Sequence, residues 1–90
     1  MLYRVELLAD AESDLAALPV KVQRQVLRKL EALALNPTPP GVKVLRGTRE
    51  RTYRIRSGDY RIVYRVESGR LVVLVLRVAP RRDVYRNLPE

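Results

Sequence analysis

Of three consecutive segments in the second half of the chain, the first two alternate in polarity with a period of two and the third is mostly apolar. They are residues 51–57, 60–67 and 70–78, and the short sequences Ser-Gly-Asp at 57–59 and Ser-Gly at 68–69 separate them. Such alternation is typical of strands, and Gly-containing turns of this length join antiparallel neighbours. The pattern therefore predicts a three-stranded antiparallel meander, whose apolar face needs a cover from the rest of the chain.

The first half of the chain supplies that cover. Residues 2–8 predict a further strand, residues 10–18 a short helix, and residues 20–35 a longer helix. The apolar positions of the longer helix recur every three or four residues: Val22, Val26, Leu30 and Leu33, joined by Leu27 and Ala34. Pro19 separates the two helices, and residues 36–41 form a proline-rich loop.

The resulting order is strand, helix, helix and three strands, with a further short strand at 83–86 as an option. This order predicts an α+β fold in which two helices pack on one face of a small, mainly antiparallel sheet. At ninety residues the chain is expected to form one domain, residues 1–90.

The first predicted hairpin places arginines opposite one another. With the turn at Gly58-Asp59, Arg56 faces Arg61. The residues that share this face, which we call the arginine face, are Arg54, Arg56, Arg61 and Arg65. Opposed like charges destabilise a sheet, so the pattern indicates either a bound anion or a solvated face with splayed side chains. The apolar run 71–76 predicts a central strand, whose Val72, Leu74 and Leu76 should form an apolar floor beside this face.

The positive charge of the chain lies in its second half. Residues 1–42 carry five bases and five acids, whereas residues 43–86 carry thirteen bases and four acids. The net positive charge of residues 43–86 indicates a polyanionic binding partner, chiefly nucleic acid. An arginine-rich proteome would explain the preference for Arg over Lys but not this asymmetry.

The residues that are missing exclude several kinds of chemistry. The chain has no Cys and no His, which excludes disulfides, thiolate metal sites, a cysteine nucleophile and the usual acid/base residue near pH 7. No signal peptide or membrane-spanning run is visible. We expect a cytoplasmic protein.

Three stretches resemble the signature of the RelE/ParE superfamily of type II toxins, and within it the RelE branch. They read KVLRG at 43–47, YRIRSGDYRIVY at 53–64 and VAPRRDVYR at 78–86. The predicted order of elements and the helix junction at Leu18-Pro19 match as well, so the resemblance covers nearly the whole chain.

The resemblance implies a ribosome-dependent mRNA endonuclease that a co-expressed antitoxin silences. Enzymes of this branch drive the 2′-hydroxyl of mRNA in the ribosomal A site onto the adjacent phosphate, without a metal or other cofactor. The positions that match the family's active site are Arg54, Arg56, Arg61, Arg81 and Tyr85, with Arg82 as the alternative to Arg81. The other bases expected to bind RNA are Lys43, Arg46, Arg49, Arg51, Arg65, Arg82 and Arg86.

One departure from the family concerns the general base. Arg54 and Arg56 stand where RelE enzymes carry lysines, and an arginine cannot give up its proton. These two residues are therefore expected to neutralise charge on the phosphorane. The base is then Tyr85 as a tyrosinate, a carboxylate such as Asp83 or Glu50, or a group on the ribosome. The alternatives for Tyr85 are stacking on an RNA base and packing as an anchor of the C-terminus.

Two other functions stay open at this point. One is a ParE-like toxin that inhibits DNA gyrase without cutting RNA, and the other is a degenerate toxin that only binds its antitoxin and operator DNA. ParE relatives usually lack the full set of basic residues with a late tyrosine, which favours RNA cleavage. The expected partners are a cognate antitoxin with an acidic segment, the ribosome with mRNA in its A site, and operator DNA only through the antitoxin.

Overall fold

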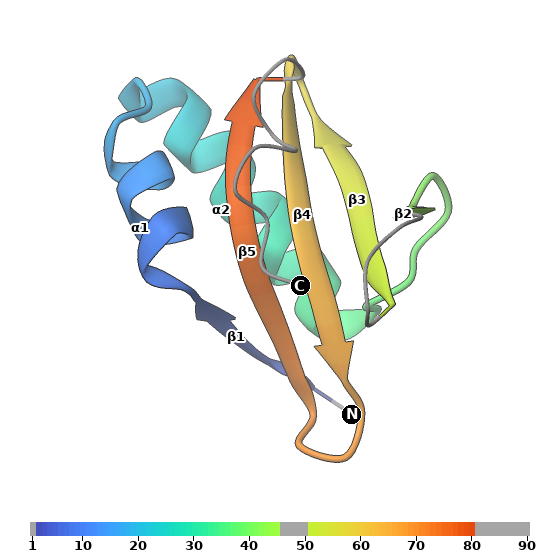
Figure 1. Cartoon of the computed structure of the whole chain (residues 1–90). Coiled ribbons are helices and arrows are strands. Elements are labelled where there is room, and N and C mark those ends of the chain that lie inside the picture. The colour runs from blue at the N-terminus through green and yellow to red at the C-terminus, as the bar shows by residue number, and fades with distance from the viewer. Residues whose placement is uncertain (1, 46–50, 81–90) are drawn as a thin grey trace.

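The computed structural model of the chain describes residues 2–45 and 51–80. Its elements are β1 (Arg4–Leu7), α1 (Ala9–Ala16), α2 (Val20–Leu35), β2 (Lys43–Leu45), β3 (Thr52–Ser57), β4 (Tyr60–Glu67) and β5 (Val72–Pro80). The strands form one sheet in the order β1-β5-β4-β3-β2. Only the β1–β5 pairing is parallel, and both helices lie on one face of the sheet (Figure 1). The predicted α+β fold is confirmed.

The long helix forms where its apolar spacing predicts it. The buried side chains of α2 are Val26, Leu30, Leu33 and Ala34. Asn36, which precedes Pro37, adopts an extended conformation and ends the helix. Leu27 differs from the expectation, because 45% of its surface is exposed. It lies at the margin of the apolar stripe, where α2 and β1 border an open groove that Tyr3 also lines.

The hydrophobic core lies between this helix layer and the sheet. Its buried side chains are Ala11, Val26, Leu30, Leu33, Ile55, Ile62, Tyr64, Val73, Val75 and Val78. They come from both helices and from β3, β4 and β5, as the alternating pattern predicts. Burying one such aliphatic side chain stabilises the fold by roughly 1.5–3 kcal/mol, so this layer holds the meander against the helices.

Tyr64 attaches the proline-rich loop to the sheet. Its ring is buried and stacks on Tyr53 with the ring centroids 5.6 Å apart. Its hydroxyl donates a 2.6 Å hydrogen bond to the carbonyl oxygen of Pro37. The loop that leads from α2 to β2 is therefore fixed to β4 from inside the molecule.

Two strand predictions need correction. The pairing of Lys43–Leu45 with β3 makes β2 a strand that the sequence did not predict, because three residues between glycines are too few to show a period. The last strand begins at Val72 instead of residue 70. Arg70 and Leu71 belong to the turn, where their backbone N–H groups bond to the carbonyls of Glu67 and Ser68. The optional strand at 83–86 lies outside the described residues.

Candidate functional site

The register of the β3–β4 hairpin is the predicted one. Arg56 pairs with Arg61, and Arg54 pairs with Val63. Gly58 in the turn has φ of +60°, a conformation that glycine adopts without strain. The alternate residues Ile55 and Ile62 point into the core. The arginine face is therefore the face of the sheet that the helices leave uncovered.

The apolar floor expected beside the arginine face is only partly present. β5 lies inside the sheet between β1 and β4, as predicted. Its Leu74 pairs with Arg65, and its Leu76 clusters with the buried Val63 and Ala79. Val72 and Leu76 are fully buried, so of the three residues expected in the floor only the half-buried Leu74 keeps exposed surface beside the arginines.

A pocket of about 280 Å³ opens at the end of this face near the β3–β4 turn. The residues that line it are Gly41, Lys43, Arg54, Ile55, Arg56 and Arg61. The four charged side chains in this set are all cationic. They come from the neighbouring strands β2, β3 and β4, since Lys43 pairs with Arg54 and Arg56 with Arg61. We call it the cationic pocket.

The arginines of the cationic pocket differ in exposure. Arg61 is 8% exposed, Arg54 is half-buried and Arg56 is exposed. None of the described carboxylates forms an ion pair with Arg56 or Arg61. A partly desolvated guanidinium attracts an anion more strongly than one in water. Two of its parallel N–H groups can donate hydrogen bonds to two oxygens of one phosphate. Arg61 is the arginine best fixed for such binding.

The loop before β2 sets the position of Lys43. Gly41 has φ of +93°, a conformation that suits glycine and strains other residues, although a Cβ there would touch nothing. The loop turns at this glycine into β2, and the bond from Tyr64 to Pro37 holds its other end. Lys43 therefore stands on an anchored segment at the rim of the pocket.

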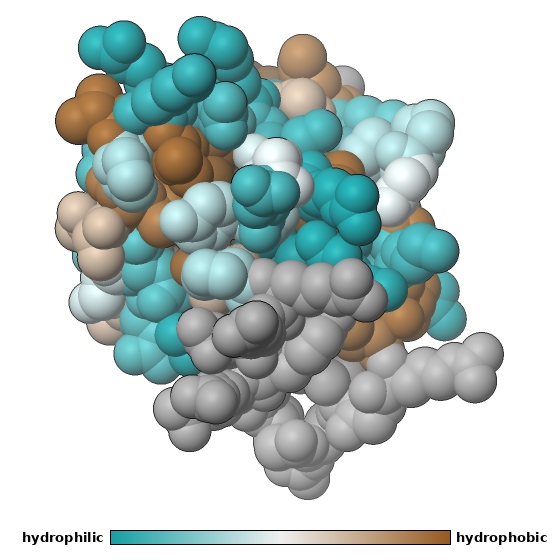
Figure 2. Space-filling model, turned by 90° about the horizontal axis from the view of Figure 1, so that it is seen from above, coloured by the Kyte–Doolittle hydropathy of each residue, from teal (hydrophilic) through white to brown (hydrophobic). Residues whose placement is uncertain are grey.

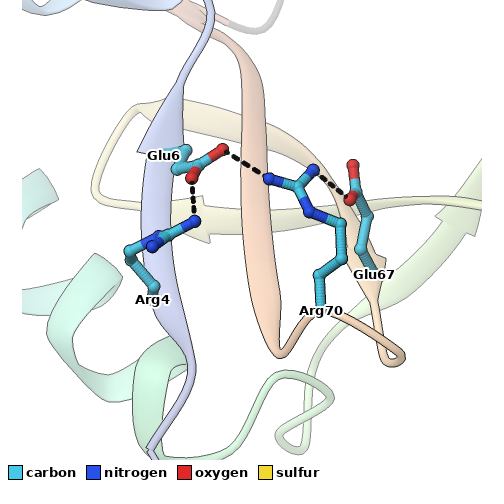
Figure 3. Close-up of polar contacts among 4 residues, drawn as sticks. All are labelled: Arg4, Glu6, Glu67 and Arg70. Atoms are coloured by element: carbon cyan, nitrogen blue, oxygen red, sulfur yellow. Dashed lines mark hydrogen bonds and ion pairs between the residues drawn. The ribbon is translucent and has the colours of Figure 1, made fainter.

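The carboxylates at the opposite end of the arginine face are neutralised by their neighbours (Figure 3). Arg4 Nη2 lies 2.7 Å from Glu6 Oε2, and Arg70 Nη1 lies 2.7 Å from Glu67 Oε2. Arg70 also approaches Glu6 at 3.7 Å. Glu67 is six residues from Arg61 along β4, which corresponds to about 20 Å. The acids of this face are therefore remote from the cationic pocket.

The structure brings together only part of the predicted site. Arg54, Arg56 and Arg61 share the cationic pocket with Lys43, which was predicted only as an RNA contact. Arg65 is outside it and its Nε donates a 3.4 Å hydrogen bond to Thr52 Oγ1, while Arg51 is exposed next to β3. The predicted residues that lie outside the described part of the chain are Arg46, Arg49, Glu50, Arg81, Arg82, Asp83, Tyr85 and Arg86.

Viewed onto the end where β5 finishes, the molecule presents hydrophilic residues between separate hydrophobic areas (Figure 2).

Over residues 2–45 and 51–80, no three carboxylates gather into a group that could hold a metal ion. Neither helix of this region combines the length and the apolar character needed to cross a membrane. The described side chains of the cationic pocket can together bind phosphate oxygens with four cations.

Comparison with known proteins places the fold and the sequence in one family. Residues 5–85 match the family described as ParE toxin of type II toxin-antitoxin system, parDE. Toxin RelE of Mycobacterium tuberculosis is 33% identical over 87 residues, which are 97% of this chain and 90% of that protein.

Two solved structures are similar in both fold and sequence. The archaeal RelE-RelB complex from Pyrococcus horikoshii matches with a TM-score of 0.77 and 34% identity, over 90% of this chain and 97% of that one. The toxin-antitoxin complex RelBE2 of Mycobacterium tuberculosis matches with a TM-score of 0.79 and 30% identity, over 90% and 100% of the two chains.

The fold, two helices on a five-stranded sheet, is similar to that of the RelE toxins in these two complexes. The chain belongs to the RelE/ParE superfamily of type II toxins. The resemblance seen in its sequence motifs is thereby confirmed.

Proposed function

We propose that this toxin is a ribosome-dependent mRNA endonuclease of the RelE type, with residues 1–90 acting as one domain in the cytoplasm. The observation that carries the proposal is the cationic pocket, in which Lys43, Arg54, Arg56 and Arg61 converge without a carboxylate among the described lining residues. A pocket lined by several cations suits the charge that develops on a phosphorane. No metal ion is needed in this reaction, because the attacking 2′-hydroxyl belongs to the RNA itself.

The proposed roles follow from burial and register. Arg61, whose guanidinium is the least exposed, binds the scissile phosphate together with Arg81. Arg54 and Arg56 bind neighbouring phosphates and add positive potential. Tyr85 accepts the proton of the 2′-hydroxyl. The remaining bases of residues 43–86 hold rRNA and mRNA phosphates, which supply most of the affinity for a nucleic acid.

A translation extract followed by primer extension on the mRNA tests this proposal. Breaks should map to codons in the ribosomal A site and should depend on added toxin. Naked RNA of the same sequence should be cut poorly, because the ribosome aligns the 2′-hydroxyl that this site cannot align by itself. Equal cleavage of naked and ribosome-bound RNA would contradict the proposal.

The same samples distinguish the main alternative. The family description names ParE toxins, so gyrase is the competing target. Gyrase-dependent DNA breaks with intact mRNA would establish a ParE-like function. Antitoxin binding without either kind of break would indicate a degenerate toxin.

We further propose a cognate antitoxin as the partner that silences the chain, since the similar structures include RelE-RelB complexes. Operator DNA would then be contacted only through the antitoxin. An acidic antitoxin segment should cover part of the arginine face, and long-range attraction should speed its association. The association rate measured by stopped flow should therefore fall as salt rises. A rate that is insensitive to salt would contradict the electrostatic part.

A further inference from the structure

The cationic pocket holds one side chain that differs chemically from its neighbours. Apart from Gly41 and Ile55, the described lining residues are three arginines and Lys43. A guanidinium stays protonated throughout catalysis, whereas an ammonium can release its proton. Lys43 is thus the described lining residue that is able to take part in proton transfer.

We propose that Lys43 is the general acid of the reaction, donating a proton from Nζ to the 5′-oxygen that leaves the scissile phosphate. The assignment rests on the proposed ribonuclease function. It gives Lys43 a catalytic role, in contrast to the phosphate contact that its sequence position suggested.

The position of Lys43 in the fold suits this role. Its cross-strand partner is Arg54, so its side chain shares a face with the three arginines. β2 is an edge strand of the described sheet, and Lys43 is exposed at its start, so its amine stands at the solvent-facing rim of the cationic pocket. The buried Arg61 can bind the non-bridging oxygens, which leaves the bridging oxygen to a group at the rim.

The proposed step conserves atoms and charge. The 2′-oxygen forms a bond to phosphorus, and its proton passes to the base, assigned above to Tyr85. The bond between phosphorus and the 5′-oxygen breaks, and that oxygen takes a proton from Lys43 Nζ. The products are a 2′,3′-cyclic phosphate and a 5′-hydroxyl, and water later restores the proton to the neutral amine.

An ammonium suits this step better than a guanidinium. The leaving 5′-alkoxide is strongly basic, so cleavage slows unless a proton arrives as the bond breaks. In model compounds an ammonium is a stronger acid than a guanidinium by about 2–3 pKa units. General-acid catalysis by a positioned group contributes about 10²–10⁴-fold to a rate. Arg54, Arg56 and Arg61 supply charge to the pocket, and Lys43 supplies the transferable proton.

The substitution Lys43→Arg tests the assignment because it keeps the charge and changes the acidity. We expect ribosome affinity and thermal stability to stay within twofold and within 2 °C of the unsubstituted chain, and the single-turnover rate to fall by about 10²-fold. Lys21→Arg is the matched control, since Lys21 is an exposed lysine on α2, away from the pocket. The control should keep the full rate.

A modified substrate separates proton donation from electrostatic help. An mRNA with sulfur in place of the bridging 5′-oxygen has a thiolate leaving group, which departs without a proton. Lys43→Arg and the unsubstituted chain should cleave this substrate at equal rates on the ribosome. A full rate for Lys43→Arg on ordinary mRNA would overturn the assignment, and so would a defect of the same size on the sulfur substrate.

The activity of the unsubstituted chain distinguishes a failure of the Lys43 assignment from a failure of the proposed endonuclease function. If it cuts ribosome-bound mRNA while Lys43→Arg behaves in either of the overturning ways, the endonuclease function stands and the role of Lys43 is wrong. If the unsubstituted chain cuts no mRNA, the endonuclease function is wrong and the assignment of Lys43 is rejected with it.

Discussion

Asp14 of α1 holds Arg77 of β5 through two parallel hydrogen bonds. Arg77 Nε donates to Asp14 Oδ2 at 2.8 Å and Nη2 donates to Oδ1 at 3.0 Å, while the backbone N–H of Val78 donates to Oδ2 at 2.9 Å. Both side chains are only 16% exposed. β1 pairs with β5 only as far as Val75. Asp14 therefore takes the place of a strand neighbour where β1 has ended.

Replacing Asp14 with Ala should destabilise the fold by about 2–4 kcal/mol. The change removes the carboxylate that accepts hydrogen bonds from the mostly buried Arg77 guanidinium and from the backbone N–H of Val78. Buried donors that lose an acceptor lower the free energy of unfolding. Urea unfolding measures the difference. Glu6→Ala is the matched control, since its ion pairs with Arg4 and Arg70 lie at the surface and should contribute less than about 1 kcal/mol. Equal losses in the two variants would contradict the special role of Asp14.

Replacing Arg56 with Thr should stabilise the protein by roughly 0.2–1 kcal/mol and lower its cleavage rate. Arg56 lies directly opposite Arg61, and opposed like charges weaken a sheet. Thr favours strands and removes the repulsion. Urea unfolding at low and high salt checks this, because salt screens the repulsion and the gain should shrink. A loss of stability at low salt would contradict the expectation.

Replacing Arg61 with Ala should slow single-turnover cleavage by about 10²–10³-fold with little change in ribosome affinity. Its nearly buried guanidinium is assigned to the charge that develops at phosphorus, whereas many other arginines still bind rRNA. Arg28→Ala on α2 serves as the control. Weaker ribosome binding with an unchanged rate in the bound state would move Arg61 to the docking surface.

The buried phenol of Tyr64 should make the fold less stable in alkaline solution. Burial raises the pKa of Tyr64 above the value of about 10 that a free phenol has, and the nearby Tyr53 adds to the rise. The folded state therefore keeps its proton while the unfolded chain loses it, so stability is complete below pH 10 and falls as the pH rises further. Thermal unfolding between pH 8 and pH 11 should show a smaller decline for Tyr64→Phe.

Tyr64→Phe also removes the hydrogen bond to Pro37, which should cost about 1 kcal/mol at neutral pH. Tyr60→Phe is the control, since Tyr60 is a half-buried tyrosine at the start of β4. An identical alkaline decline in both variants and in the unsubstituted chain would contradict the contribution of Tyr64.

Two substitutions of Tyr85 separate its proposed roles. Tyr85→Phe keeps the ring and removes the hydroxyl, so a loss of about 10²-fold or more in single-turnover rate supports proton transfer. A near-normal rate in Tyr85→Phe with a large loss only in Tyr85→Ala would leave stacking as its role. Ribosome affinity measured in parallel shows whether either change acts through binding.

The elements with a strong period were predictable from the sequence. α2 spans the predicted residues 20–35, and the Arg56–Arg61 pairing follows from a two-residue turn at Gly58. Alternation in a hairpin fixes which side chains share a face once the turn is known. The fold class and the location of the arginine face could therefore be predicted.

What the sequence could not predict depends on contacts between distant segments. In the sequence, Asp14 is an acidic residue of a predicted helix and Arg77 is a basic residue of a predicted strand. Their spacing does not indicate that the two side chains contact each other. The β4–β5 register shifts after Val63, so that Tyr64 pairs with Val75, and a periodic pattern hides such an irregularity. The place of Lys43 in the cationic pocket depends on β2, which is too short for its period to be seen.

The parallel pairing of β1 with β5 has a consequence for synthesis of the chain. The first described strand pairs with the last described one, from Arg4 with Val72 to Leu7 with Val75. Until Val72 has emerged, β1 lacks the strand with which it pairs in the described sheet, and one edge of β4 is unpaired. Contacts this distant in sequence form late, because a long loop must close first. A nascent chain that stops before Val72 therefore lacks a complete sheet, and the described fold forms only after β5 has emerged.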